Sequence, residues 1–335
     1  MSVEPSGLER VFFPVHSRAQ IDGWVRSVVH RQLGRRTRAL VFRSGRIDSV
    51  YGVQLVDGES VVLRLYRPPV DIGALTARVK AMRLLADSGY PCPLPLAAPF
   101  STDGRVGAIE TLLTQGGDGD VRQPRVRRAF VSSLLQHIDL LRDQPAIARR
   151  LVTRPAWTEY RGGPWPRPHD SIFDFSTTPT GWEWMNAVAQ RATAEIATLR
   201  ERRADLGGQV IGHGDWYAGN VRFSDSRVVA AFDWDLIVED EAVLVGLSAG
   251  GFTTDGAPSP QDVSGFIGDA SALRGGFSGE QMRAASAAAR WVLAFNARCQ
   301  LSNLGNRADL TAAEIEQASY LQRLYDERDA LEQIS

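Results

Sequence analysis

Residues 209–235 place two aspartates and an asparagine on short turns between apolar segments, and this spacing constrains the fold more than any other feature. Three apolar runs in this stretch predict short strands: Gln209 to Gly212, Val221 to Phe223 and Val228 to Phe232. Asp215 and Asn220 lie between the first two strands, and Asp233 follows the third. Such oxygen ligands suit a hard cation such as Mg²⁺, which takes one or two carboxylates together with substrate phosphates. The pattern also leaves Asp215 to accept a proton from an attacking hydroxyl.

The spacing H-x-D-x-x-x-x-N, with a further Asp at a strand end, resembles the catalytic core of the kinase-like small-molecule phosphotransferases. This family includes aminoglycoside phosphotransferases, choline kinases and related enzymes. The resemblance implies that Asp215 is the catalytic aspartate, which receives or orients the substrate hydroxyl. It also implies that Asn220 and Asp233 bind the metal and that His213 supports the loop backbone. Gly214 stands where protein kinases have Arg, which indicates the small-molecule branch.

Three other interpretations of these residues are weaker. A β-hairpin with polar turn residues needs no function, because Asp, Asn and Gly favour turns. A haloacid-dehalogenase-type D-x-D nucleophile would have Thr or Val after its second Asp and lie near the chain start, whereas Leu236 follows Asp235 here. A metallohydrolase would need histidines at ligand spacing, and the five histidines include no such pair.

Composition permits an enzyme of this kind. The 335 residues are enough for one large domain or two lobes. A net charge of −1 gives no electrostatic case for nucleic acid or a membrane surface. The two cysteines, Cys92 and Cys299, lie far apart, which argues against a disulfide framework and predicts a cytoplasmic protein. The polar opening residues predict no signal peptide, and no apolar run is long enough to span a bilayer.

The elements predicted before residue 115 follow the plan of a kinase-like N-terminal lobe. Their ranges are helix Ala19 to Leu33, strands Ala39 to Phe42, Ser49 to Leu55 and Ser60 to Tyr66, helix Ala74 to Leu85 and strand Arg105 to Leu113. Asp57-Gly58 predicts a hairpin turn between the second and third strands. The expected fold is therefore α+β and two-lobed, with a small antiparallel-sheet nucleotide-binding lobe (residues 1–115). A mostly helical catalytic and acceptor-binding lobe (residues 116–335) follows.

The resemblance also implies where ATP binds. The loop at residues 44–49 would lie over the phosphates, where small residues such as Ser49 let backbone N–H groups approach anionic oxygens. An ordinary hairpin loop explains this loop equally well. Glu110 stands for residues 110–113, the segment between the lobes, whose backbone would pair with the adenine edge.

Two arginines depart from the kinase pattern. The third-strand lysine that holds the nucleotide phosphates aligns with Arg64, which can bind phosphates and stays charged. The helix position that carries the partner glutamate aligns with Arg78. Three explanations are open: a wrong register, another carboxylate such as Asp71 as the partner of Arg64, or no ion pair. The nonfunctional alternative makes Arg64 an outward-facing strand residue.

The rest of the chain is predicted to be mainly helical, with helices at Val126 to Arg142, Trp184 to Glu201, Gly279 to Leu301 and Thr311 to Glu332. Residues 154–182, rich in Pro, Gly and aromatics, either border the acceptor pocket or form a surface insertion. Residues 250–269 are predicted to be a connection. The acidic residues 239–241 either face a cationic acceptor or stabilise a helix start.

The function that these patterns indicate is transfer of the γ-phosphoryl group of ATP, with Mg²⁺, to a hydroxyl of a small molecule. Asp215 would be the base, Asn220 and Asp233 the metal ligands, and Arg64 a phosphate ligand. Asp235 would join the metal shell or touch the acceptor, which is an antibiotic, an amino alcohol or a sugar-like metabolite. The alternative is a kinase-fold nucleotide-binding or regulatory protein with little transferase activity, as Arg64 and Arg78 suggest.

Overall fold

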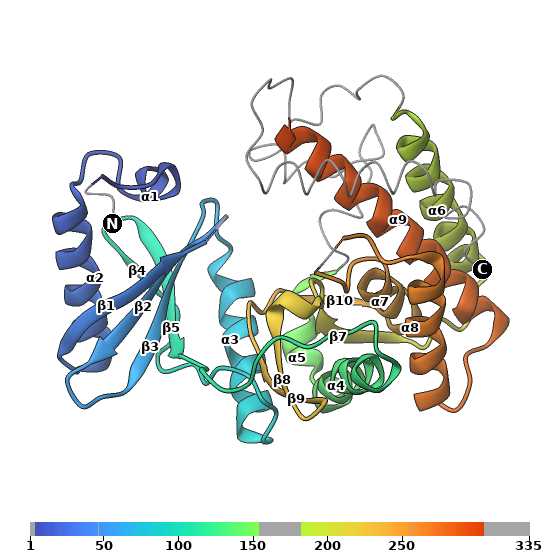
Figure 1. The fold of residues 1–335 in the computed structure, drawn as a ribbon, viewed down its shortest axis with the longest axis horizontal. Coiled ribbons are helices and arrows are strands. Elements are labelled where there is room, and N and C mark those ends of the chain that lie inside the picture. Colours follow the sequence, from blue (N-terminus) through green and yellow to red (C-terminus); the bar gives the residue numbers. More distant parts are fainter. Residues whose placement is uncertain (1–3, 46, 154–181, 255, 305–335) are drawn as a thin grey trace. The chain divides into compact units, whose positions relative to one another are not determined.

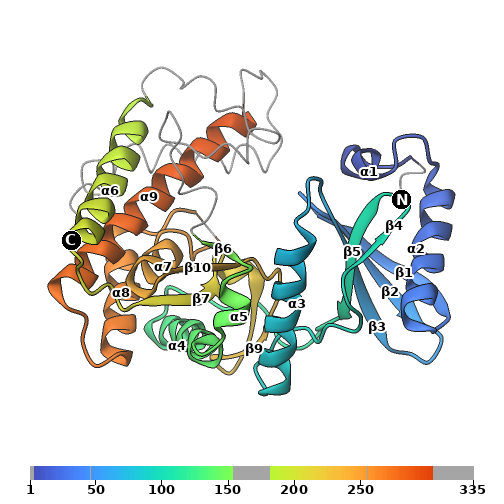
Figure 2. The same ribbon diagram turned by 180° about the vertical axis from the view of Figure 1, so that it is seen from behind.

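A computed structural model describes residues 4–45, 47–153, 182–254 and 256–304 (Figures 1 and 2). The chain divides into two compact units, residues 1–115 and 116–335. The predicted helix at Thr311 to Glu332 and almost all of the segment at 154–182 lie outside the described residues. In the described part of the chain, no helix is both long enough and apolar enough to cross a bilayer.

The first unit is built on an antiparallel sheet of five strands in the order β1-β2-β3-β5-β4 (Figure 1). The strands are β1 (Thr37–Ser44), β2 (Ser49–Leu55), β3 (Ser60–Tyr66), β4 (Phe100–Thr102) and β5 (Arg105–Thr111). The helices described in this unit are α1 (Gly7–Phe12), α2 (Arg18–Leu33) and α3 (Ile72–Asp87). The predicted elements are all present, with β4 and α1 in addition.

Side chains of the sheet alternate between two faces, as the two-residue period of a strand requires. Odd-numbered residues such as Leu63 and Leu65 pack with Ile21 and Val25 of α2 in the larger core. The opposite face packs against α3, where Leu75 and Val79 contact Ala108 of β5, with Tyr66 and Val106 beside them. Because the register pairs Arg64 with Ala108, this alternation puts Arg64 on the face covered by α3.

Local signals fix the ends of these elements. Ser17 caps α2 in a capping box with Gln20, and Gly34 ends it with a φ of 67°. The Asp71 side chain accepts hydrogen bonds from the backbone N–H groups of Gly73 and Ala74, at 2.7 and 3.0 Å, and so caps α3.

The second unit is mostly helical, with two small sheets (Figure 2). One sheet has the order β6-β10-β7, and the other is the hairpin β8-β9. These strands are β6 (Val152–Thr153), β7 (Gln209–His213), β8 (Val221–Ser224), β9 (Arg227–Ala231) and β10 (Leu236–Asp240). The helices described are α4 (Pro124–Leu141), α5 (Pro145–Ala148), α6 (Trp184–Glu201), α7 (Glu241–Ala249), α8 (Pro260–Leu273) and α9 (Gly279–Leu304). This arrangement confirms the predicted α+β class.

The predicted connection at residues 250–269 is wrong in its second half, because α8 begins at Pro260. Ser259 caps this helix in a capping box with Asp262, and Pro260 occupies the first turn. These three residues are a helix-start signal that outweighs the Gly- and Ser-rich composition around them. Strand β10 was also not predicted. It pairs with β7 in the sheet and leads directly into α7.

Helices α7 and α9 approach each other closely at two glycines. A Cβ on Gly246 would collide with the backbone of Ala285, and one on Gly250 would collide with the backbone of Ala289. The four-residue spacing puts both glycines on one face of α7 or just beyond its end, where a bare backbone lets the helices pack tightly.

Replacing Gly246 by alanine is therefore expected to destabilise the protein by about 1–3 kcal/mol, because overpacking forces the backbone of α9 to move. The matched control is Gly268→Ala in α8, where nothing lies within 4 Å of an added Cβ. That change is expected to be neutral or to stabilise by up to about 1 kcal/mol, because alanine favours helices over glycine. Urea unfolding measures both, and equal stabilities would contradict the close packing.

Candidate active site

Two loops of the second unit carry the predicted catalytic residues. The first runs from β7 to β8 and holds Asp215 and Asn220, the latter in a short 3₁₀ turn (Ala218–Asn220). The second joins β9 to β10 and holds Asp233 and Asp235. Because β7 pairs with β10, with His213 opposite Leu236, the first loop begins beside the point where the second loop ends.

Hydrogen bonds tie the loops together. Gly214 donates its N–H to the carbonyl oxygen of Asp235 at 2.7 Å, and Phe232 donates its N–H to the carbonyl oxygen of Asn220 at 3.0 Å. The Asn220 side chain donates through Nδ2 to Oδ2 of Asp215 at 3.2 Å and to its carbonyl oxygen at 3.1 Å. The structure thus brings Asp215 and Asn220 into direct contact, beside the turn that carries Asp233.

A pair of buried histidines supports the first loop. His213 accepts the N–H of Asp215 on Nδ1 at 3.1 Å, so Nε2 carries its ring proton and lies 3.4 Å from the carbonyl oxygen of Phe232. The N–H of His213 is donated in turn to Nε2 of His137, on α4, at 3.1 Å. Both histidines are fully buried. His213 therefore supports the loop backbone, as the resemblance implied.

Aromatic rings surround this pair. Trp216 stacks on Phe130 of α4, with ring centroids 5.0 Å apart, and Trp234 lies 5.1 Å from His213 and 5.3 Å from His137. Each indole N–H reaches a backbone carbonyl, that of Phe130 for Trp216 and that of Ala231 for Trp234. Each loop is therefore anchored by a buried tryptophan that directly follows an acid.

His137 was not identified from the sequence, which predicted only a helix at Val126 to Arg142 with apolar residues at helical spacing. A histidine in such a stripe has the composition of ordinary core, and only the fold shows that it accepts a hydrogen bond from β7. The sequence signal for this buried support is the pair of D-W dipeptides at 215–216 and 233–234. A tryptophan after each acid indicates that each loop is anchored in the core.

Asp233 adopts a left-handed backbone conformation, with a φ of 60°. This region costs most side chains about 1–2 kcal/mol, although Asp and Asn tolerate it best. The sharp turn lets the chain leave β9, present Asp233, and enter β10 three residues later. Strained residues of this kind gather at functional sites, where the surrounding structure holds them in place.

Like charges and the surrounding protein act together on Asp215. Desolvation raises its pKa to about 6, with further contributions from the negative charges of Asp233 and Asp235, while the Asn220 hydrogen bond opposes the rise. The residue itself is exposed to solvent, as a group that meets a substrate must be. The upward direction of the pKa follows from the two neighbouring carboxylates even where water reaches the side chain.

The donor set suits Mg²⁺ better than a metal held by protein ligands alone. Among the described residues, no three His, Cys, Asp or Glu side chains form a group that could hold a metal. Mg²⁺ needs no such group, because it takes one or two protein oxygens and keeps its remaining positions for water and phosphate. Asn220 uses its side-chain nitrogen to bind Asp215, so Oδ1 is the atom that suits a hard cation.

The first unit carries the three predicted nucleotide residues. Arg64 lies on β3 and forms an ion pair with Asp48, Nη1 to Oδ2, at 3.5 Å. Asp71, which the sequence offered as its partner, caps α3 instead. Arg78 of α3 lies over Tyr66, with its guanidinium carbon 5.9 Å from the ring centroid. Burial raises the pKa of Tyr66 to about 12, while the charges of Arg64 and Arg78 oppose this rise.

Ser49 and Glu110, the other two residues predicted to lie near the nucleotide, both belong to strands of the sheet. The Ser49 side chain is buried and donates a hydrogen bond to the Tyr51 hydroxyl at 3.0 Å, and its backbone belongs to β2, opposite Leu65. Glu110 lies inside β5, between Val62 of β3 and a bridge to Pro95. A segment that pairs with adenine would therefore begin after β5, beyond Glu110.

The acids at 239–241 form ion pairs with arginines of the second unit. Arg200 of α6 binds both Glu239 and Asp240, and Arg142 and Arg274 bind Glu241. Glu239 and Glu241 are buried, at 2% and 5% exposure. The expectation that this cluster faces a cationic acceptor is therefore wrong, because arginines neutralise it inside the protein.

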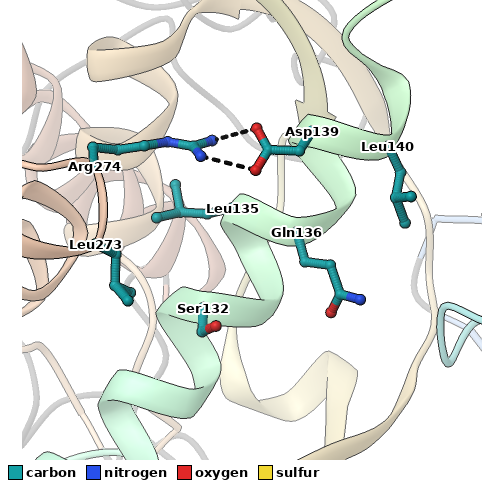
Figure 3. Close-up of a pocket in the computed structure, with 7 residues that line it drawn as sticks. All are labelled: Ser132, Leu135, Gln136, Asp139, Leu140, Leu273 and Arg274. Carbon is teal, nitrogen blue, oxygen red and sulfur yellow. Dashed lines mark hydrogen bonds and ion pairs between the residues drawn. The ribbon is translucent and has the colours of Figure 1, made fainter.

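Arg274 also makes two hydrogen bonds to Asp139 of α4, at 2.8 and 2.9 Å (Figure 3). This pair lies in a hollow of about 380 Å³ whose lining residues are Ser132, Leu135, Gln136, Asp139, Leu140, Leu273 and Arg274. None of them is a predicted site residue, so the hollow plays no part in the candidate active site.

Comparison with known proteins places the chain. Residues 38–240, more than half of its length, match the model of the phosphotransferase enzyme family. No curated protein sequence matches it. Among solved structures, an amicoumacin kinase in complex with AMP-PNP, Ca²⁺ and Ami is similar, with a TM-score of 0.67 and 10% identity over 95% of this chain and all of that one.

Two further structures are similar at comparable identity. A spectinomycin phosphotransferase in complex with ADP and spectinomycin has a TM-score of 0.54 and 13% identity, over 93% of this chain and 97% of that one. A macrolide 2′-phosphotransferase from Brachybacterium faecium has a TM-score of 0.50 and 16% identity, over 91% and 96%. The fold is that of the kinase-like small-molecule phosphotransferases. The chain belongs to the phosphotransferase enzyme family, as the sequence resemblance predicted.

His137 should make stability depend on pH. Burial, with a smaller contribution from His213, keeps its pKa well below the usual value of 6.5, so His137 is neutral in the native protein. The unfolded chain protonates this residue below pH about 6.5. The contribution of neutral His137 to the free energy of unfolding is therefore complete above that pH. It decreases by up to about 1.4 kcal/mol for each pH unit below it.

Two variants separate this titration from the hydrogen bond. His137→Gln retains an acceptor without titrating and is expected to reduce the slope of unfolding free energy between pH 5 and 7. His137→Leu also leaves the buried N–H of His213 without its acceptor, which costs about 1–3 kcal/mol at every pH. Denaturant unfolding across this pH range measures both. An unchanged slope in His137→Gln would contradict the assignment.

In the metal-free protein, Asp215 is expected to titrate near pH 6, observed by carbon NMR of its carboxyl group. Asp235→Asn should lower this pKa, because it removes a like charge while retaining a side chain of similar size. The control is Asp225→Asn, in the turn between β8 and β9, which should leave the titration unchanged. A pKa near 4 in the unmodified protein would contradict the raised pKa and the influence of Asp233 and Asp235 on it.

Proposed function

We propose that this protein transfers the γ-phosphoryl group of ATP to a hydroxyl group of a small molecule, and that Mg²⁺ is required. The observation that carries the proposal is the contact between Asp215 and Asn220 beside Asp233, on loops locked by buried histidines and tryptophans. Phosphoryl transfer depends mainly on positioning and charge stabilisation, so a few rigidly held groups are enough to specify it.

Asp215 is proposed as the catalytic base. Asn220 binds one of its carboxylate oxygens, Oδ2, which leaves Oδ1 as the atom to accept the proton of the attacking hydroxyl. A pKa of about 6 suits this role, because a base is most effective when its pKa lies near the working pH. The hydrogen bond from the N–H of Asp215 to His213 holds the residue in place as the proton moves.

Asn220 and Asp233 are proposed to hold the metal, through Oδ1 of the amide and the carboxylate. When bound, Mg²⁺ would neutralise charge on the phosphates during transfer. The negative charges of Asp215, Asp233 and Asp235 favour the binding of a cation in this region. The Asp235 carboxylate is proposed either to join the metal shell or to touch the acceptor, while its backbone carbonyl oxygen accepts the N–H of Gly214.

The two units are proposed to divide the work as a nucleotide-binding lobe (residues 1–115) and a catalytic and acceptor-binding lobe (residues 116–335). Arg64 is proposed to bind the α- and β-phosphates, because a guanidinium stays charged and presents several donors to phosphate oxygens. The loop before Ser49 would contribute backbone N–H groups. The adenine contact is proposed for the segment just after Glu110.

The acceptor is proposed to be a hydroxyl-bearing small molecule, such as an antibiotic, an amino alcohol or a sugar-like metabolite. The similar structures include enzymes named for amicoumacin and spectinomycin, which supports testing antibiotics first. The buried ion pairs of residues 239–241 remove one reason to expect a cationic acceptor. Residues 154–181 lie outside the described structure and carry no part of this proposal.

The proposal predicts that the wild-type protein binds Mg·ATP and hydrolyses it slowly without an acceptor. Asp215→Ala should reduce turnover by about 10²–10⁴-fold with little change in nucleotide affinity, because the base acts in the transition state. Asp233→Asn should weaken binding of the Mg²⁺ complex. Phosphate release and calorimetric binding of Mg·AMP-PNP measure these two effects separately. Asp225→Asn is the matched control.

Screening hydroxyl-bearing antibiotics and metabolites for ATP-dependent phosphorylation then identifies the acceptor. Binding of Mg·ATP without turnover on any acceptor would favour a nucleotide-binding regulatory protein with the same fold. An absence of nucleotide binding would contradict both functions.

A further inference from the structure

Helix α3 lacks an acid where a phosphate-binding cation of β3 would find its partner. Its only acidic residue is Asp87, which is the last residue of the helix. At the position expected for an acid, Arg78 lies over the Tyr66 ring. The charges of Arg64 and Arg78 lower the pKa of Tyr66, whereas those of Glu110 and Asp48 raise it, so both signs of charge gather near this ring. A negative partner for Arg64 comes from outside α3.

Asp48 supplies that charge from the end of the loop before β2. The hairpin register pairs Val50 with Arg64 and Ser49 with Leu65. Asp48 is two residues before Val50, so the strand period puts it on the same face as Arg64 and diagonal to it. The ion pair at 3.5 Å follows from this register, and both side chains are mostly buried, at 17% and 19% exposure.

A second contact anchors the carboxylate. Oδ1 of Asp48 accepts the backbone N–H of Arg67 at 3.0 Å, while Oδ2 faces Arg64. Arg67 directly follows β3, the strand that carries Arg64. Asp48 is therefore hydrogen-bonded to the residue that follows β3, the strand of its partner Arg64. This contact fixes the position of the carboxylate beside the guanidinium.

Gly45 makes this position of Asp48 possible. Its φ is 121°, and a Cβ built on it would collide with the carbonyl oxygen of Asp48. The loop thus folds back upon itself, with Gly45 against the backbone of Asp48, and only glycine has the required backbone freedom and lack of side chain. The single glycine of this loop has a structural task that does not depend on a bound phosphate.

We propose that Asp48 is the positioning residue for Arg64, and that it takes the place of the acid that α3 lacks. This inference rests on the proposed function, in which Arg64 binds the phosphates of ATP. A guanidinium has five N–H donors, enough to serve a carboxylate and a phosphate together, whereas an ammonium is a point charge. An arginine on β3 therefore matches an acid that reaches it from the end of the loop before β2.

The test measures binding of Mg·AMP-PNP to the full chain by calorimetry, so no acceptor is needed. Asp48→Asn is expected to weaken binding about tenfold, because it removes a charge-assisted contact that holds Arg64. Asp48→Glu should restore most of the affinity. Asp57→Asn is the matched control, since Asp57 also forms an ion pair with an arginine of this unit, Arg35, and should leave the affinity unchanged. Thermal unfolding of each variant shows that the fold is intact.

A double variant identifies the route of the effect. Arg64→Met should weaken binding more than Asp48→Asn, and adding Asp48→Asn to Arg64→Met should cost nothing further. A purely structural role of Asp48 would instead lower affinity equally in both backgrounds, which would overturn the proposal. Tighter binding in Asp48→Asn would also overturn it, because Asp48 would then compete with phosphate. No binding by the wild-type protein would instead refute the proposed function.

Discussion

The hydrogen-bonded pair His137 and His213 is the interaction on which the candidate active site depends. The His213 ring accepts the backbone N–H of Asp215, and the backbone N–H of His213 is donated to the His137 ring, so the loop and β7 are tied to helix α4. Buried polar groups are costly without partners, and here each one satisfies another. Trp216 and Trp234 close the cluster from both loops, which excludes water and fixes the ring positions.

Strand β10 separates two kinds of acidic residue. Before the strand, Asp233 and Asp235 lie beside Asp215, where their charges repel and raise its pKa. At its other end, Glu239, Asp240 and Glu241 form ion pairs with arginines from α6 and from the ends of α4 and α8. Removing one partner of a buried ion pair costs far more than an exposed pair contributes, so these arginines hold the helices to the strand.

Much of the fold could be predicted from local pattern. Strands β2 and β3 and helix α6 begin and end at the predicted residues, because their periodicity and the Asp57-Gly58 turn are strong signals. Helix α8 was missed although Ser259, Pro260 and Asp262 form a helix start. Strand β10 was missed because two of its five residues are acids, and Arg200, which pairs with both, comes from the distant helix α6.

The candidate site shows the same limit. Asp215, Asn220 and Asp233 could be chosen from their spacing, whereas the support from His137 depends on how α4 packs and has no sequence signature. The ion pair of Arg64 with Asp48 was not predicted, although part of its geometry follows from the strand register. The partner of Arg64 was predicted to be a carboxylate such as Asp71, although the register set by the hairpin turn places Asp48 diagonal to Arg64.

A crystal structure of the complete chain with Mg²⁺ and AMP-PNP tests the central claim most directly. The account predicts a metal bound by Oδ1 of Asn220 and the carboxylate of Asp233, with Asp215 outside the metal shell and hydrogen-bonded to Asn220. A metal bound by Asp215, or a nucleotide whose phosphates lie away from Asn220 and Asp233, would contradict it.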